Sequence, residues 1–459
     1  MATRLDVDYL VVGAGAMGMA FTDALVDHAD VRVALVDRRH GAGGHWLEAY
    51  PFVRLHQSSA FYGVASTLLG GGRLQDHGPE AGLQERASQP EVVAYYAHVL
   101  DRLQQTGRVQ FLPGSDHLGD GTVLSRVSGR RFEVPEHCRL VNAHYLAPSI
   151  PAEMPAPFGV GDGARVLPVN DLVHVEEAPS QYVVVGAGKT ATDACVWLLA
   201  QGVDPDAICW VRPRDPWMFD RALIQPDPAI FLGVPATIFE AAVASESLDE
   251  VFLRLEDAGV MLRIDRSVTP TMAKTPTLAQ WELERLRTIE DVVRRGHLRS
   301  VERGRLTFLD GSTVRVADDA VVVHCAADGL KYPPLVPVWR PEDITLQPIR
   351  AGFPCFGAAV TGYVEATRDD DAEKNRLCPP SPFPDSLQQW AGMNVLGTRA
   401  AMSFSAEPDI KAWADGVALN PARVPAGYPP SAALDAARER LAASTGPGLE
   451  RLAAWMGRV

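Results

Sequence analysis

The six cysteines of this 459-residue sequence are scattered, and no two of them are spaced as in a Cys-x-x-Cys motif. This scatter argues against a redox-active dithiol and against a cysteine-rich structural zinc site. We therefore expect no bound metal. We expect most of the cysteines to be small buried hydrophobic residues.

Long runs of one residue type are also missing. No apolar stretch approaches the ~18 residues of a membrane-spanning helix, and the first residues enter a strand pattern without the apolar core of a signal peptide. There is no long basic run, and the formal net charge of -14 argues against nucleic-acid binding. We expect a cytoplasmic protein that binds neither a membrane nor nucleic acid, and its oligomeric state stays open.

The chain does contain two glycine-rich turns in matching settings. The first spans Tyr9 to Gly18 (YLVVGAGAMG), where a β-branched strand is followed by a tight turn and a helix start, with candidate contacts at Gly13, Gly15 and Gly18. Backbone N–H groups and the helix dipole at such a turn can hold a pyrophosphate. The next predicted strand ends at Asp37, 19 residues past Gly18. A carboxylate there accepts a hydrogen bond from a ribose 2′-OH, as in FAD or NAD, and we assign the adjacent Arg38 to the same site.

The second turn spans Tyr182 to Ala191 (YVVVGAGKTA), with candidate contacts at Gly186, Gly188, Lys189, Thr190 and Ala191. Its next strand is followed by Arg212 and Arg214 rather than by an acid. Such an arginine pair suits the 2′-phosphate of NADPH, and a solvated basic edge is the alternative. One glycine-rich turn also occurs in sheets that bind no nucleotide, but two in matching strand contexts make that interpretation weak.

The order of strand and helix patterns predicts an α/β fold with two Rossmann-like dinucleotide-binding domains, the first suited to FAD or NAD and the second to NADP, accompanied by β-meanders and a helical insertion. Residues 1–178 form the first part of the FAD-binding domain and include a small meander over 122–142. Residues 179–325 form the NADP-binding domain, whose helical insertion covers about 228–296. Residues 326–459 return to the FAD domain and add C-terminal helices.

Two further segments carry a family resemblance. Residues 43–46 read GGHW and residues 50–57 read YPFVRLHQ. Together with the order of the domains, they resemble the class B flavin-dependent monooxygenases of the two-dinucleotide-binding-domain flavoprotein superfamily. In that family a GGxW motif follows the second strand, and the next segment approaches the flavin ring. The resemblance implies cofactor contacts for Gly44 and Trp46.

The same resemblance implies catalytic roles for His56 and Gln57, with Arg54 as a third candidate. An imidazole at position 56 can titrate near neutral pH and hydrogen-bond a peroxide or a reduced flavin. The alternative is a packed histidine under the cofactor. Trp46 likewise stacks near the flavin or is a core tryptophan.

The activity that this resemblance implies is NADPH-dependent monooxygenation, in which a hydroperoxyflavin transfers oxygen from O₂ to a small organic substrate. The reaction would be N- or S-oxidation, hydroxylation or Baeyer-Villiger insertion. One departure weighs against it: the family fingerprint FxGxxxHxxxW/Y falls between Phe158 and Leu172, where Pro168 takes the place of the histidine. A non-oxygenating FAD/NADP oxidoreductase, either an oxidase or a reductase, is therefore the alternative, and a non-catalytic cofactor-binding protein is the third hypothesis.

Two other groups have a functional and a structural interpretation. Lys374, Asn375 and Arg376 lie in an acidic neighbourhood, where they either reach a phosphate or a substrate carboxylate or form a solvated charge run, which we favour. Apolar residues of the insertion either wall a substrate pocket or belong to the core; they are Phe231, Leu232, Phe239 and Phe252.

Overall fold

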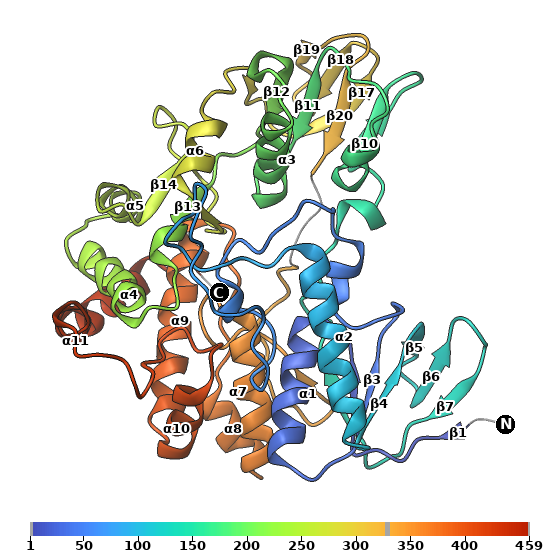
Figure 1. The fold of residues 1–459 in the computed structure, drawn as a ribbon, viewed down its shortest axis with the longest axis vertical. Helices are drawn as coiled ribbons and strands as arrows, with labels where there is room; N and C mark the ends of the chain where they lie inside the picture. The colour runs from blue at the N-terminus through green and yellow to red at the C-terminus, as the bar shows by residue number, and fades with distance from the viewer. Residues whose placement is uncertain (1–2, 326–330, 458–459) are drawn as a thin grey trace.

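The computed structural model describes residues 3–325 and 331–457 (Figure 1). The first domain is built on a parallel sheet of five strands in the order β21-β8-β2-β3-β4. The last part of the chain supplies β21 and so returns to this sheet. The strands are β2 (Tyr9–Val12), β3 (Val33–Val36), β4 (Val109–Leu112), β8 (Arg139–Asn142) and β21 (Ile344–Thr345).

Three helices border this sheet: α1 (Ala16–His28), α2 (Gln89–Gln105) and α7 (Pro354–Thr367). Because α1 follows β2 and α7 follows β21, both helices begin at the carboxyl edge of the sheet. They pack closely where small residues permit it, since a Cβ on Gly362 would lie 2.4 Å from the carbonyl oxygen of Phe21. α2 starts with a capping box in which the Ser88 N–H donates to Glu91 at 2.7 Å.

The second domain has its own five-stranded parallel sheet, in the order β10-β20-β11-β12-β16. Figure 1 shows it at the opposite end of the molecule from the first sheet. The helix α3 (Lys189–Ala200) starts directly after the second glycine-rich turn. The α/β fold class with two Rossmann-like domains is thereby confirmed. The strands are β10 (Arg165–Pro168), β11 (Tyr182–Val185), β12 (Ile208–Val211), β16 (Val292–Val293) and β20 (Val321–His324).

Two smaller sheets accompany the domains, in the orders β1-β7-β6-β5 and β19-β18-β17-β9. The predicted meander over residues 122–142 is wrong for its last strand, because β8 lies inside the first parallel sheet. A short apolar run has the same sequence pattern whether the strand belongs to a small meander or to a parallel sheet. The strands are β1 (Thr3–Arg4), β5 (Ser115–His117), β6 (Thr122–Ser125), β7 (Arg131–Glu133), β9 (Gly159–Val160), β17 (Leu298–Glu302), β18 (Arg305–Phe308) and β19 (Thr313–Arg315).

The insertion in the second domain is only partly helical. It begins with α4 (Pro228–Val243) and α5 (Leu248–Asp257) and continues with β14, β15 and α6 (Gln280–Leu286). The two strands pair with β13, which precedes the insertion, in a third small sheet ordered β14-β13-β15. The strands are β13 (Trp217–Asp220), β14 (Met261–Arg263) and β15 (Thr277–Leu278). This sheet borders the loop that carries residues 50–57, so the insertion reaches the first domain.

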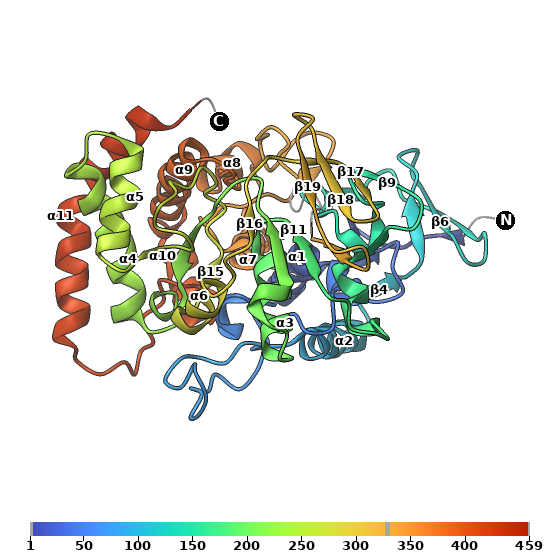
Figure 2. The same cartoon turned by 90° about the horizontal axis from the view of Figure 1, so that it is seen from above.

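The C-terminal helices pack against both domains. Figure 2 shows α11 lying alongside α4, and a Cβ on Gly448 of α11 would lie 2.5 Å from the Cβ of Phe239. Phe231, Phe239 and Phe252 are buried in the same core, which agrees with the interpretation of these residues as core rather than as the wall of a substrate pocket. The helices are α8 (Asp371–Leu377), α9 (Leu387–Ser405), α10 (Pro408–Gly416) and α11 (Ala432–Trp455). Short 3₁₀ turns are η1 (Gly44–Glu48), η2 (Ser59–Phe61), η3 (Pro151–Glu153), η4 (Val169–His174), η5 (Pro205–Ala207) and η6 (Arg221–Leu223).

The prediction of a solvated charge run at 374–376 is wrong for Lys374, which is buried, whereas Arg376 is exposed. Lys374 is 3% exposed, and its Nζ lies 2.6 Å from Glu365. Glu365 also accepts hydrogen bonds from Tyr9 Oη and Trp339 Nε1, each at 2.7 Å. The network joins α7 and α8 to β2, because a buried lysine requires such partners.

In the described part of the chain, no helix is both long enough and apolar enough to cross a lipid bilayer.

We predict that Gly362→Ala destabilises the first domain. The added methyl group would meet the backbone of α1 at 2.4 Å, and such overpacking costs about 1–3 kcal/mol of unfolding free energy. Thermal or urea unfolding measures the change. Gly233→Ala in α4 is the matched control, because no atom lies within 4 Å of the added methyl group and alanine is the better helix former. Equal stability of the two variants would contradict the close packing of α1 and α7.

Candidate functional site

The first glycine-rich turn is tied to the predicted ribose-binding acid. Gly13 has a φ of 111°, and a Cβ on Gly18 would lie 1.9 Å from the Gly13 carbonyl oxygen, so both positions require glycine. Asp37, 6% exposed, accepts hydrogen bonds from the backbone N–H of Ala14 at 2.7 Å and of Arg39 at 2.8 Å. The carboxylate is therefore held beside the turn, and each of its oxygens retains a lone pair.

The loop that carries the GGHW motif lies directly on this turn. The Gly43 N–H donates to the Ala14 carbonyl at 2.9 Å. A Cβ on Gly44 would lie 3.0 Å from the Cα of Gly15, and the φ of Gly44 is 61°. Only glycine fits this approach comfortably, which leaves two adjacent backbone segments to line one narrow site.

Two of the predicted cofactor residues already have partners in the protein. Trp46 is 6% exposed and donates from Nε1 to Tyr62 Oη at 2.6 Å, which favours the core interpretation. Arg38 is exposed at the surface and pairs with Glu153 at 2.8 Å. Neither contact points to the first turn.

Residues 50–57 connect the two domains. The Tyr50 hydroxyl donates to Asp193 of α3 at 2.8 Å, and Phe52 stacks on Trp197 of the same helix with 4.9 Å between ring centroids. Lys189, at the second glycine-rich turn, pairs with Asp193. The segment predicted to approach the flavin therefore lies against the start of the predicted NADP-binding helix.

His56 is held from both its backbone and its ring. Its carbonyl accepts hydrogen bonds from Arg221 Nε at 3.0 Å and from the Thr277 hydroxyl, and its Nδ1 faces the Thr277 N–H at 3.4 Å. Burial lowers the pKa of His56 to about 3, with further lowering by Lys189, Arg221 and Arg86. The prediction that His56 titrates near neutral pH is wrong, because the ring is desolvated among cations. Since Nδ1 is an acceptor, the proton of this neutral ring is on Nε2.

The other two catalytic candidates lie differently. Gln57 is 7% exposed. Arg54 is exposed and donates to the Arg86 carbonyl at 3.1 Å. It lines an open cavity of about 900 Å³ between α2 and α3, whose wall also includes Phe52 and Trp197. His56 and Gln57 do not line that cavity, so the structure does not bring all three candidates together.

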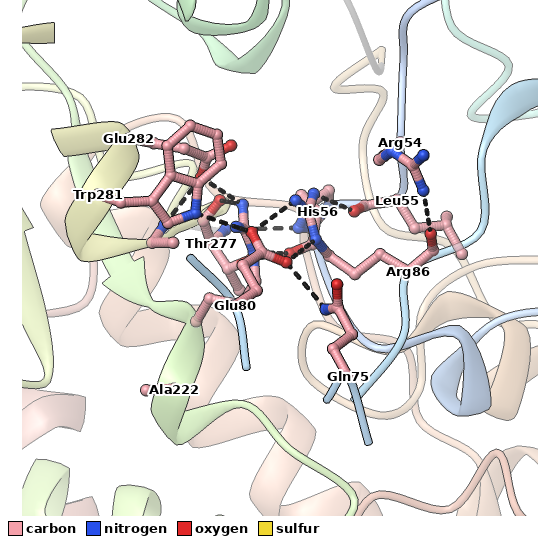
Figure 3. Close-up of polar contacts among 12 residues, drawn as sticks. Arg54, Leu55, His56, Gln75, Glu80, Arg86, Ala222, Thr277, Trp281 and Glu282 are labelled. Carbon is pink, nitrogen blue, oxygen red and sulfur yellow. Dashed lines mark hydrogen bonds and ion pairs between the residues drawn. The ribbon is translucent and has the colours of Figure 1, made fainter. Parts of the chain in front are cut away.

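A buried ion cluster surrounds the His56 backbone (Figure 3). It was not predicted from the sequence. Arg221, 0% exposed, lies 2.5 Å from Glu80 and 2.6 Å from Glu282. Glu80 also accepts from Arg86 at 2.6 and 2.9 Å. Burial alone raises the pKa of Glu80, but Arg86 and Arg221 outweigh it and hold the pKa at about 2. Despite burial, the same arginines, with Lys189, lower the pKa of Glu282, so both glutamates of the cluster are held as carboxylates.

At the second turn, Gly186 has a φ of 136°, and its carbonyl accepts from Trp210 Nε1 at 2.8 Å. The Arg212 guanidinium lies over the Trp210 ring, 4.6 Å from its centroid, and 3.4 Å from Asp215. Arg212 is 2% exposed, and its Nε and one terminal nitrogen have no hydrogen-bond partner among the described residues. Burial lowers its pKa to about 10. The guanidinium beside the turn is therefore cationic, with one long ion pair to Asp215 and an Nε that has no partner in the described chain.

Arg214 differs from Arg212 in having a partner. It makes a bidentate pair with Asp385 at 2.8 and 2.9 Å, and Lys274 lies 3.5 Å from the same carboxylate. The two arginines of the predicted fork therefore do not converge on one free site. Arg214 instead ties the second domain to the start of α9.

Pro168, which replaces the fingerprint histidine, ends β10 and is in register with His324 at the end of β20. His324 is 4% exposed, and its Nδ1 has no hydrogen-bond partner within the described ranges. Burial lowers its pKa. A histidine therefore lies next to the fingerprint position, on the neighbouring strand.

Arg350 is a further cation that sequence patterns did not single out. It lies in the loop between β21 and α7, at the carboxyl edge of the first sheet. Burial lowers its pKa to about 10. Among residues 3–325 and 331–457, the structure gives its side chain neither a hydrogen bond nor an ion pair.

The chain is similar to one sequence profile and to several solved structures. The profile described as "NAD(P)-binding Rossmann-like domain" matches residues 11–63, which include the first turn and the GGHW loop. Among solved structures, cyclohexanone monooxygenase from Rhodococcus sp. Phi1 bound to NADP+ is 15% identical, with 98% of each chain covered and a TM-score of 0.47. An oxidized steroid monooxygenase bound to NADP is 14% identical over 97% of this chain and 99% of its own, with a TM-score of 0.48.

Curated relatives are much nearer in sequence. "Uncharacterized protein Rv2000" of Mycobacterium tuberculosis and "Uncharacterized protein Mb2023" of Mycobacterium bovis are each 42% identical over 423 residues. The match covers 91% of this chain and 78% of each relative. Identity at this level over most of both chains requires a common fold and descent, so the chain belongs to the same family as these mycobacterial proteins.

Proposed function

We propose that the protein is an NADPH-dependent flavin monooxygenase that holds FAD at the first glycine-rich turn and NADPH at the second, and that oxygenates a small organic molecule with O₂. The observation that carries this proposal is the contact of residues 50–57 with the start of α3, through the Tyr50–Asp193 hydrogen bond. This contact joins the segment next to one nucleotide turn to the helix that begins at the other. Two cofactors bound there would have their reactive ends close together.

The residues of the first turn fit FAD. Gly13, Gly15 and Gly18 shape a turn that a pyrophosphate can approach, and Gly44 closes the opposite side. The Gly13 N–H donates to the Val36 carbonyl at 2.8 Å, so the N–H groups at the start of α1 would hold the pyrophosphate. Asp37 is fixed to accept the ribose hydroxyl. Arg350, without a partner in the described chain, would supply a positive charge at the same sheet edge. When bound, the flavin supplies the electron transfer and oxygen activation that side chains cannot provide.

The second turn fits NADPH through Gly186, Gly188 and Arg212. Arg212 Nε, which has no partner among the described residues, would donate to a 2′-phosphate, and Nη1 would exchange its 3.4 Å ion pair with Asp215 for the same group. Lys189, Thr190 and Ala191 form the start of α3. The Ala191 N–H donates to the Gly188 carbonyl at 3.1 Å, so the N–H groups of Lys189 and Thr190 are the ones that would approach the pyrophosphate. Arg214 would join only by leaving Asp385.

His56 acts in this proposal as a neutral hydrogen-bond donor at Nε2. Its low pKa excludes a general acid that gains and loses a proton at physiological pH. A fixed neutral donor can stabilise an electron-rich acceptor atom while taking no proton from it. Gln57, buried beside it, would position the same segment, and the exposed Arg54 would act from the cavity side.

A non-oxygenating FAD/NADP oxidoreductase is the second candidate. It is favoured by Pro168, which removes the imidazole that the monooxygenase fingerprint has at this position. His324, in register with Pro168, counts against it, since an imidazole is present on the adjacent strand. The two functions differ in whether oxygen from O₂ ends in an organic product.

We predict that the purified protein, reconstituted with FAD, shows flavin absorbance that NADPH bleaches without oxygen. After O₂ is admitted, ketones, amines and sulfides are screened by comparing NADPH consumed with H₂O₂ formed. For a monooxygenase, at least one compound makes NADPH consumption exceed H₂O₂ formation, with an oxygenated product found by mass spectrometry. If NADPH consumption equals H₂O₂ formation with every compound, the oxidase or reductase function is favoured. If the protein does not retain flavin, both the monooxygenase and the oxidase or reductase functions are overturned.

We predict that Asp37→Ala weakens FAD binding by about 10- to 100-fold, because a hydrogen bond to a charged group contributes about 1.5–3 kcal/mol. Equilibrium dialysis or fluorescence titration measures the dissociation constant. Asp116→Ala removes an exposed carboxylate that pairs with Arg126 and is the control. An unchanged dissociation constant in Asp37→Ala would remove Asp37 from the ribose site.

We predict that Arg212→Ala raises the KM for NADPH by roughly 10-fold or more and leaves the KM for NADH nearly unchanged, since only NADPH carries the 2′-phosphate. Initial-rate kinetics with both cofactors give the ratio. Arg294→Ala is the control, because Arg294 pairs with the same Asp215 at 2.8 Å. Equal changes in the KM for NADPH and for NADH would show that Arg212 does not bind the 2′-phosphate.

A further inference from the structure

We propose that Arg221 and Thr277, in the second domain, are positioning residues that orient His56 of the first domain. The inference rests on the proposed function for the role of His56, but the orientation itself is a property of the chain. Neither residue belongs to a nucleotide-binding motif. They follow β13 and begin β15, in the part of the second domain that reaches across to residues 50–57.

The grip on His56 consists of three contacts. Arg221 Nε and the Thr277 hydroxyl both donate to the His56 carbonyl, and the Thr277 N–H faces His56 Nδ1 at 3.4 Å. The backbone contacts fix the position of the residue, and the ring contact fixes its tautomer. With Nδ1 occupied as an acceptor, Nε2 carries the proton and is the donor.

Arg221 is suited to this role because its planar guanidinium contacts three segments of the chain at once. Nε faces the His56 carbonyl, while its two terminal nitrogens pair with Glu80 at 2.5 Å and Glu282 at 2.6 Å. A lysine at this position would present a single ammonium group and could not keep this planar geometry. The two carboxylates hold the guanidinium in place, and the guanidinium in turn holds the loop.

The charges around His56 keep its ring neutral. Lys189 of α3, Arg221 after β13 and Arg86 of the first domain all lower its pKa, and Glu282 of α6 raises it. The cations outnumber the acid, and burial acts in the same direction. His56 therefore stays a neutral donor across the physiological pH range.

The cluster has a simpler interpretation, in which it only joins the two domains. That interpretation predicts that Arg221 and Arg86 are equivalent, since both are buried arginines paired with Glu80. The positioning role predicts a difference. Arg86 donates to the Leu55 carbonyl at 2.9 Å and, within the described residues, makes no hydrogen bond to His56. Arg86→Lys keeps the positive charge that lowers the pKa of His56, so it is the matched control.

The test is nitrogen NMR of the full-length, flavin-free protein labelled with ¹⁵N-histidine, with the His56 signals assigned by their loss in His56→Gln. In the wild-type protein we expect a single neutral tautomer, protonated at Nε2, that does not titrate between about pH 5.5 and 8. Arg221→Lys and Thr277→Val should each produce a mixture of tautomers or a shifted Nδ1 signal. Arg86→Lys should leave both His56 nitrogen signals unchanged.

Thr277→Val keeps the backbone N–H and nearly the same volume, so it remains informative where Arg221→Lys fails to fold. A His56 ring unaffected by either variant, or affected equally by Arg86→Lys, would overturn the proposal. In the flavin-loaded protein, the same two variants should lower kcat for NADPH consumption by roughly 10- to 100-fold with little change in KM. If the protein takes up no flavin, the proposed function fails, and the NMR result still decides the positioning role.

Discussion

The complete burial of Arg221 is the constraint on which the joint between the two domains depends. The positive charge of a guanidinium that is shielded from solvent needs anionic partners, since removing one partner of a buried pair costs about 3–5 kcal/mol of stability. Glu80 and Glu282 provide that compensation from two different domains. A change in the relative placement of the domains would leave at least one buried charge unpaired. The cluster therefore fixes how residues 50–57 meet the second glycine-rich turn.

The local parts of the site follow directly from the sequence. Gly13, Gly18 and Asp37 are specified by spacing along one strand-turn-helix-strand unit, and their geometry depends on neighbours within about 25 residues. The return of the chain to the first sheet also follows, because a second complete nucleotide unit leaves the remaining residues without a sheet of their own. These features have a period or a motif that a reader of the sequence can recognise.

The ion cluster has no such signal. His56 and Arg221 are 165 residues apart, and Arg221 and Glu80 are 141 residues apart. Glutamate and arginine are ordinarily surface residues, so nothing in the sequence marks these four as buried. The pKa of His56 could not be inferred for the same reason, because burial lowers it most and three cations from three segments lower it further. Strand β8 was misplaced because its four residues carry no information about which sheet they join.

The two arginines after β12 contribute differently to a phosphate site, and their burial decides how. Arg214 pairs with Asp385 at a surface where the two side chains are 40% and 27% exposed, and exposed pairs of this kind contribute only about 0–1 kcal/mol. A dianionic phosphate can therefore displace Asp385 at little cost. Arg212 is already desolvated and its Nε has no partner in the described chain, so a phosphate that reaches it forms a new hydrogen bond and displaces only the long, 3.4 Å ion pair with Asp215. Arg212 therefore provides most of the discrimination, and Arg214 adds to it only when its link to α9 opens.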